Sequence, residues 1–301
     1  MNKVQKIFLL IFTFSVVIFF KTITIDGIVE KYNDGFWGIE LIGYRERAIE
    51  NEIRIAILDT GIYQAHSAFE NLEFSTYDLT YIMGTQRDLS HGTAIMGIIA
   101  SLSPVSVIQI PDNLKVYDIR VLNNYGRGIV EDLILGIQIA INYEVHIINI
   151  SSGFNMPHPE LENTILEALN QGIVVISAAG NTYGLSVDLP ARIENVISVN
   201  AINYYESRSI FGARGSINLI APGENVYSLC VTNQYDYFTG TSFSAAYVTG
   251  ALITHLDYFL NQYEEVFSID YFLNWIFNRA DLLENQTTHS EYGYGILRTL
   301  K

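Results

Sequence analysis

The chain has 301 residues, of which 49% are hydrophobic and 16% charged, so it can bury a large core and is not a disordered protein. Its net charge of −15 argues against nucleic-acid binding, because neutralising a phosphate backbone requires Lys and Arg. The single cysteine, Cys230, excludes an intrachain disulfide framework and any multi-cysteine metal site.

Residues 1–29 are predicted to be a targeting segment ahead of the folded domain. Lys3 and Lys6 precede an apolar run, residues 7–20, which is short for a membrane span and suits the core of a signal peptide. Bulky residues follow it in place of a small-residue cleavage pattern, so a cleaved signal peptide and an uncleaved membrane anchor both fit. Either places the remaining chain outside the cell, secreted or anchored, because basic residues ahead of such a run stay inside. A buried helix of the domain is the alternative.

From residue 53 onward, short apolar runs alternate with segments of helical periodicity. The predicted strands are residues 53–58, 114–122, 145–150, 173–177, 196–200 and 217–221. The predicted helices are residues 91–102, 129–143 and 160–171, one that follows Ser242, and one over 268–282 with Ser268 as its cap. This alternation predicts a single α/β domain over residues 30–301, a doubly wound, mainly parallel sheet with helices on both faces.

Four polar residues stand at predicted strand ends or helix starts, the side on which an open α/β sheet builds its site. Asp59 ends the first strand, His91 opens a helix, Asn181 follows the strand 173–177, and Ser242 opens the last core helix. Each alone has an ordinary explanation as a turn or capping residue. Together they supply a nucleophile, a base, an orienting carboxylate and an amide donor, the parts needed for acyl transfer.

The motifs ILDTGI, HGTAIMGIIA, INISSG, SAAGN, LIAPG and GTSFSAAYVTGA, in that order, resemble those of the subtilisin family of serine proteases. The resemblance implies a serine endopeptidase in which Ser242 attacks the scissile carbonyl, His91 transfers the proton and Asp59 orients the imidazole. It also implies that the Asn181 side chain and the Ser242 backbone N–H bind the oxyanion. Thr241 would support the turn that carries the nucleophile.

The same resemblance implies residues that bind an extended peptide by main-chain hydrogen bonds and shape its primary pocket. They are Gly126, Arg127, Gly128, Ser151, Ser152, Gly153, Ser177, Ala178, Ala179 and Gly180. Asp188, just before a Leu189–Pro190 bond expected to be cis, would lie at the floor of that pocket. A carboxylate there predicts cleavage after Arg or Lys. The alternative is a solvated loop aspartate.

No cofactor and no metal site is expected, since the loop at residues 101–113, where the family usually binds calcium, offers few oxygen ligands. The expected partner is a peptide or protein substrate that is basic at the cleavage site, with the membrane as a second partner if residues 7–20 form an anchor. Two roles compete: processing of a secreted peptide, by analogy with family members that remove leaders from bacterial peptide antibiotics, and general scavenging. A non-catalytic, membrane-attached peptide-binding module is the rival class, and the complete four-residue set argues against it.

Overall fold

The computed structural model describes residues 36–43, 49–80, 88–100, 113–232, 234–263, 268–283 and 289–300. The predicted targeting segment, residues 1–29, and most of the loop at residues 101–113 lie outside these ranges. Within the described ranges, no helix is both long enough and apolar enough to cross a membrane.

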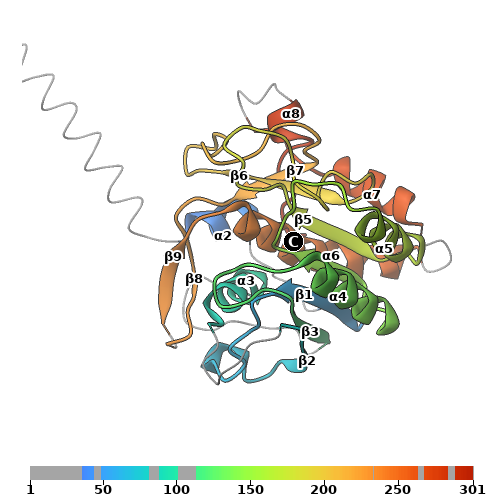
Figure 1. Ribbon diagram of the computed structural model, residues 1–301. Helices are drawn as coiled ribbons and strands as arrows, with labels where there is room; N and C mark the ends of the chain where they lie inside the picture. The colour runs from blue at the N-terminus through green and yellow to red at the C-terminus, as the bar shows by residue number, and fades with distance from the viewer. Residues whose placement is uncertain are drawn as a thin grey trace, which may run out of the picture.

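A parallel sheet of seven strands forms the centre of the molecule, in the order β2-β3-β1-β4-β5-β6-β7 (Figure 1). The strands are β1 (Ile53–Asp59), β2 (Glu73–Asp78), β3 (Leu114–Arg120), β4 (Ile147–Ile150), β5 (Val174–Ala178), β6 (Ile197–Ile202) and β7 (Leu219–Pro222). A separate antiparallel pair joins β8 (Val226–Leu229) to β9 (Tyr235–Phe238).

Helices cover both faces of the sheet, which confirms the predicted doubly wound fold. On one face lie α3 (Ser90–Ala100) and α6 (Thr241–Gln262), and on the other α4 (Val130–Asn142) and α5 (Pro159–Asn170). Strand β1 shows how the core divides: Ile55 and Ile57 pack with the first layer, whereas Ala56 and Leu58 pack with the second. The smaller elements are α2 (Trp37–Ile42), η1 (Ser67–Phe69), α7 (Ile269–Phe277) and α8 (His289–Tyr292).

Some local expectations differ from the structure. The sequence did not predict β2, β8 or β9. Strands β2 and β9 carry exposed polar and tyrosine side chains in place of an apolar run, and β8 has only four residues. Ser268 stands at the N-cap of α7 as expected, but its side chain makes no capping hydrogen bond.

The connections of β1 create the crevice in which the site lies. Strands β3 and β4 pair with opposite edges of β1, so the loop after β3 and the loop after β4 lie on opposite sides of β1. Such a switch in strand order leaves a crevice beyond the carboxyl ends of the strands, where α/β proteins bind their ligands. Asp59 is the last residue of β1 and therefore stands at this crevice.

Candidate active site

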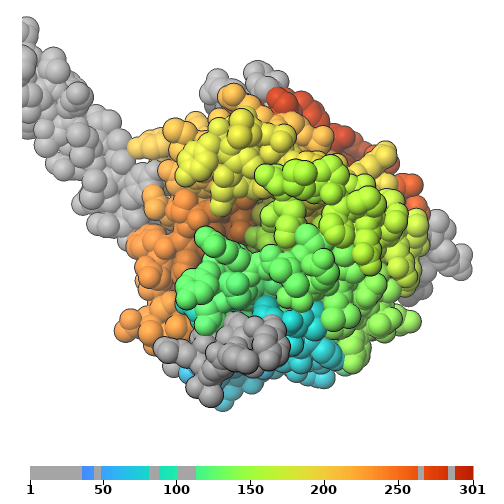
Figure 2. All heavy atoms as spheres, in the orientation of Figure 1, coloured from blue at the N-terminus to red at the C-terminus, as the bar shows by residue number. Residues whose placement is uncertain are grey.

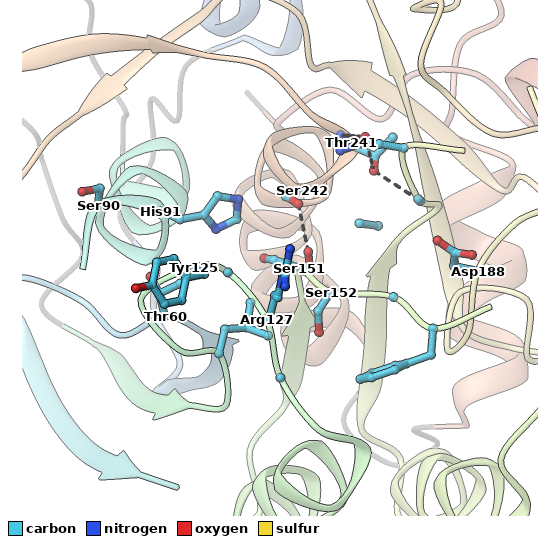
Figure 3. Close-up of a pocket in the computed structure, with 18 of the residues that line it drawn as sticks. Thr60, Ser90, His91, Tyr125, Arg127, Ser151, Ser152, Asp188, Thr241 and Ser242 are labelled. Carbon is cyan, nitrogen blue, oxygen red and sulfur yellow. Dashed lines mark hydrogen bonds between the residues drawn. The ribbon is translucent and has the colours of Figure 1, made fainter. Parts of the chain in front are cut away.

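A cavity of about 830 Å³ opens at the crevice. Its lining includes His91, Asn181, Asp188 and Ser242, together with the loops after β3 and β4 (Figure 3). In the space-filling view, green, yellow and orange segments meet around the hollow (Figure 2). Residues far apart in the sequence thus converge on one concave surface.

The Asp59 carboxylate and the His91 imidazole form the central pair of this site. Nδ1 of His91 lies 2.8 Å from Oδ1 and 3.0 Å from Oδ2 of Asp59. The loop after β1 reaches the start of α3, where the Gly92 N–H donates to Thr60 Oγ1 at 3.1 Å. A Cβ on Gly92 would collide with the backbone oxygen of Gly61, so only glycine permits this close approach of helix to loop.

The electrostatics of the pair favour ionised Asp59 and protonated His91. Burial would raise the pKa of Asp59, but the His91 charge and hydrogen bond outweigh burial and hold that pKa below its usual range. Burial would lower the pKa of His91, but Asp59, with a smaller contribution from Asp88, raises it above its usual value. The arrangement therefore stabilises an imidazolium, the charge that develops when this histidine accepts a proton.

Ser242 is the second residue of α6, and the residue is 8% exposed. Its hydroxyl donates to the carbonyl oxygen of Ser151 at 2.9 Å, and the imidazole of His91 lies on the other side of the hydroxyl in Figure 3. The N-cap of α6 is Gly240 and makes no side-chain capping bond, so neither Thr241 nor Ser242 is the helix cap. The backbone N–H of Ser242 belongs to the first turn, where donors lack intrahelical acceptors.

Asn181 is tied to the same helix start through its side-chain oxygen. Asn181 Oδ1 accepts the Thr241 backbone N–H at 3.0 Å and the Thr241 hydroxyl at 3.1 Å, and Thr241 Oγ1 accepts the Gly180 N–H at 3.3 Å. With Oδ1 occupied in this way, the Nδ2 amide is the Asn181 group that remains for a ligand. Thr241 therefore supports the turn, as expected.

Two short segments form the walls of the cavity. They are Gly126–Gly128, in the loop after β3, and Ser151–Gly153, directly after β4. Ala178 and Gly180 also line the cavity, whereas Ser177 and Ala179 are fully buried and are not among its lining residues. Ser177 lies on β5, and the Ala179 N–H and carbonyl pair with the main chain of Val199 and Asp188, so the place of these two residues in a substrate site stays a prediction.

Asp188 lies at the end of the cavity, between Gly153 and Gly180. A Cβ on Gly153 would come within 2.8 Å of Asp188 Cβ, and one on Gly180 would collide with the Asp188 carboxylate. The Leu189–Pro190 peptide bond is cis. Burial raises the pKa of Asp188, and Arg192 partly opposes this. The carboxylate thus occupies a half-buried position that only glycine neighbours leave open.

Sequence reasoning missed a buried acidic group behind the pair. Asp118, on β3, is 2% exposed; its Oδ2 accepts the Ile62 N–H and the Gln64 side chain, while its Oδ1 has no hydrogen-bond partner. Burial raises its pKa to about 6. The strand 114–122 was predicted from its apolar residues, and the alternation of Asp118 with Arg120 was the signal available. Phe238, which also lines the cavity, was missed with β9.

Across the described ranges, no group of three or more His, Cys, Asp or Glu side chains is arranged to hold a metal ion. The cavity and its lining offer a hydroxyl, an imidazole with its carboxylate, and an amide.

Residues 50–295 match the model of the subtilase family of peptidases. Subtilisin BL of Lederbergia lenta is 30% identical over 221 residues, which cover 71% of this chain and 81% of that protein. A thermostable alkaline protease of Halalkalibacterium halodurans is 34% identical over 227 residues, which cover 71% of this chain and 60% of that protein. A solved mutant of the protease domain of PatA has the same fold, with a TM-score of 0.72 at 24% identity over 84% of this chain and 94% of that one. The chain belongs to the subtilase family of serine endopeptidases.

Proposed function

We propose that this protein hydrolyses peptide bonds through Ser242, His91 and Asp59, with Asn181 as an oxyanion donor, and that it cleaves after a basic residue. The observation that carries the proposal is the bonded Asp59–His91 pair facing the same cavity as a helix-start serine. No binding module needs this pair beside that serine.

The reaction begins with a change in the Ser242 side chain. Its hydroxyl donates to Ser151 in the free protein, so a rotation about Cα–Cβ must first direct it toward Nε2 of His91. Oγ then attacks the scissile carbonyl carbon while Nε2 accepts the hydroxyl proton, and Asp59 stabilises the resulting imidazolium. The Asn181 amide and the Ser242 N–H stabilise the oxyanion.

The remaining steps return the protein to its starting state. The oxyanion collapses, the C–N bond breaks, and the imidazolium gives its proton to the departing amine. Water then attacks the acyl-serine ester, again with His91 as the base, and releases the second product.

The preference for a basic residue rests on Asp188. Gly153 and Gly180 leave room for the Asp188 carboxylate at the end of the cavity, where it can accept a guanidinium or ammonium group that enters the cavity. Arg can bind such a carboxylate with two parallel hydrogen bonds. The net charge of −15 adds a long-range attraction for basic peptides that weakens with salt.

Two measurements test these assignments. A fluorophosphonate probe should label wild type at Ser242 and should not label Ser242→Ala; an unlabelled wild type would favour the non-catalytic peptide-binding alternative. Matched peptides that differ only in the residue before the scissile bond should show higher kcat/KM for Arg and Lys than for Phe and Leu. Asp188→Ser should erase that order, and an unchanged order would remove Asp188 from the pocket.

We further propose that the domain acts outside the cell, secreted or anchored through residues 7–20, and processes a secreted peptide. Lys3 and Lys6 ahead of the apolar run support this orientation. Protease added to intact cells should degrade the domain, and protection there with degradation in lysates would contradict export. General scavenging would instead appear as cleavage of most unrelated peptides in a proteome-derived library.

A further inference from the structure

One cation in the cavity stands out from the other cations of the described part of the chain. The remaining described basic side chains all have partners: Arg54 and Lys115 with Glu52, Arg120 with Asp78, Arg208 and Arg214 with Glu291, Arg298 with Asp281, Arg192 with the Asn155 carbonyl, and Arg279 over the Trp275 ring. The Arg127 guanidinium has no such partner among the described residues, although the chain carries 32 acidic residues.

The backbone that carries Arg127 is held in place. The Asn123 N–H donates to the Arg127 carbonyl at 2.8 Å, and Asn123 Oδ1 accepts the N–H groups of Tyr125 and Arg127 at 2.9 and 3.2 Å. Gly126 provides the left-handed turn with φ of 66°. Figure 3 shows the Arg127 side chain directed across the cavity toward Ser151. A loop held by these hydrogen bonds therefore presents to the cavity a guanidinium that no described residue pairs with.

The carboxylates of the cavity do not explain this charge. Asp188 stands beside Gly153 and Gly180 at the end of the cavity, and Figure 3 shows it apart from Arg127. Asp88 is occupied by Ser90, whose N–H and hydroxyl both donate to Asp88 Oδ1, at 3.0 and 2.5 Å. The positive and negative groups of the cavity thus remain separate, and a ligand that satisfies both must itself carry charges of both signs.

We propose that Arg127 is a specificity-determining residue that pairs with an acidic side chain of the substrate, two to four residues before the scissile bond. This rests on the proposed function, in which the last residue before that bond enters the Asp188 pocket. The residues that precede it must then lie between the walls Gly126–Gly128 and Ser151–Gly153. The preferred substrate has an acidic residue followed shortly by Arg or Lys.

The test measures kcat/KM of the full-length chain, purified in detergent, on peptides with Arg before the scissile bond. Positions two, three and four before that bond carry Glu, Gln or Lys in turn. At one of these positions, kcat/KM for the Glu peptide should exceed that for the Gln peptide by about 3- to 30-fold, the range for a charge-assisted pair in a partly open cleft. The advantage should shrink in high salt. The net charge of the protein disfavours acidic peptides, so a preference for Glu must arise locally.

Variants separate the local effect from the total charge. Arg127→Gln should abolish the Glu advantage, and Arg127→Glu should reverse it in favour of Lys. Arg54→Gln removes the same charge at the amino end of β1, far from the cavity, and should keep the preference. Equal rates for Glu and Gln peptides, or a Glu preference that survives Arg127→Gln, would refute the inference. Absence of hydrolysis for all peptides would instead refute the proposed function.

Discussion

The hydrogen bonds between Asn181 and Thr241 allow a quantitative prediction about the proposed oxyanion site. Asn181→Ala removes the proposed oxyanion donor, and it also removes the acceptor of the Thr241 N–H and hydroxyl. Loss of one preorganised donor lowers kcat by about 10²–10³, with KM little changed, because the interaction forms only in the transition state.

Stability should fall in the same variant. Thr241 is 1% exposed, so its N–H and hydroxyl cannot readily exchange the lost acceptor for water. At about 1–3 kcal/mol for a buried group left without its partner, and with Asn181 itself exposed, we expect a loss of about 2–4 kcal/mol in the free energy of unfolding.

Thr241→Val separates orientation from donation. It keeps the side-chain shape and the Asn181 amide, but it removes the hydroxyl that holds Asn181 Oδ1 and accepts the Gly180 N–H. We expect kcat to fall about tenfold, since a loosely held amide loses part of its preorganisation. Thr241→Ser keeps the hydroxyl and serves as the control.

The assay is a double-mutant cycle on kcat with one peptide, together with urea unfolding of each variant. The variant with both Asn181→Ala and Thr241→Val should have the same kcat as Asn181→Ala alone, because both changes act through one amide. An additional tenfold loss in the double variant would show that Thr241 acts by another route. An unchanged kcat in Asn181→Ala would refute the oxyanion assignment itself.

Three further predictions concern charge and space around the site. Asp59→Asn should lower the plateau of kcat/KM by a factor of about 10⁴. Because Asp59 raises the pKa of His91, the acid limb of the pH profile of kcat/KM should also move to lower pH in this variant. An unmoved limb would contradict the effect of Asp59 on His91. Gly180→Ala should lower Tm, because the φ of 101° at this position is strained for alanine. It should also abolish the preference for Arg, because the new Cβ would collide with the Asp188 carboxylate. Unchanged specificity would show that the carboxylate is not fixed there. Asp118 has a pKa raised to about 6 in the folded state, against 3.8 for the isolated group, so the folded protein binds the extra proton and stability falls as pH rises through this interval. In urea unfolding, Asp118→Asn should therefore gain about 2 kcal/mol relative to wild type between pH 4 and pH 8. A difference independent of pH would refute the assignment.

The core elements were predictable because burial on both faces of a parallel strand leaves a continuous apolar run. The runs at 53–58, 173–177 and 196–200 all became strands of the sheet, with ends shifted by one or two residues. Edge strand β2 and strand β9 bury little, so no such run marks them, and β8 is buried but only four residues long.

The site was partly predictable for a related reason. Asp59 and His91 could be placed near one another from strand ends and helix starts, because the fold brings those positions to one edge, whereas the roles proposed for them rest on the resemblance to the subtilisin family. The direction of the Ser242 hydroxyl could not, since it depends on a rotamer and on the carbonyl of Ser151 from a distant segment. The hydrogen bonds of the buried Asp118 could not be predicted either, because their donors come from the loop after β1.

The spread of the site along the sequence has a consequence for when the protein can act during its synthesis. Asp59 ends the first strand of the sheet, whereas Ser242 lies in the first turn of the long helix α6, which packs against β4, β5, β6 and β7. The far end of that helix returns to the start of the domain, where Asp257 accepts the backbone N–H groups of Glu50 and Asn51. A growing chain therefore cannot join its hydroxyl to its imidazole until most of its length has emerged. Such distant pairings also slow folding, so under the proposed function the nascent polypeptide stays inactive as a protease while its own unfolded segments are most vulnerable to cleavage.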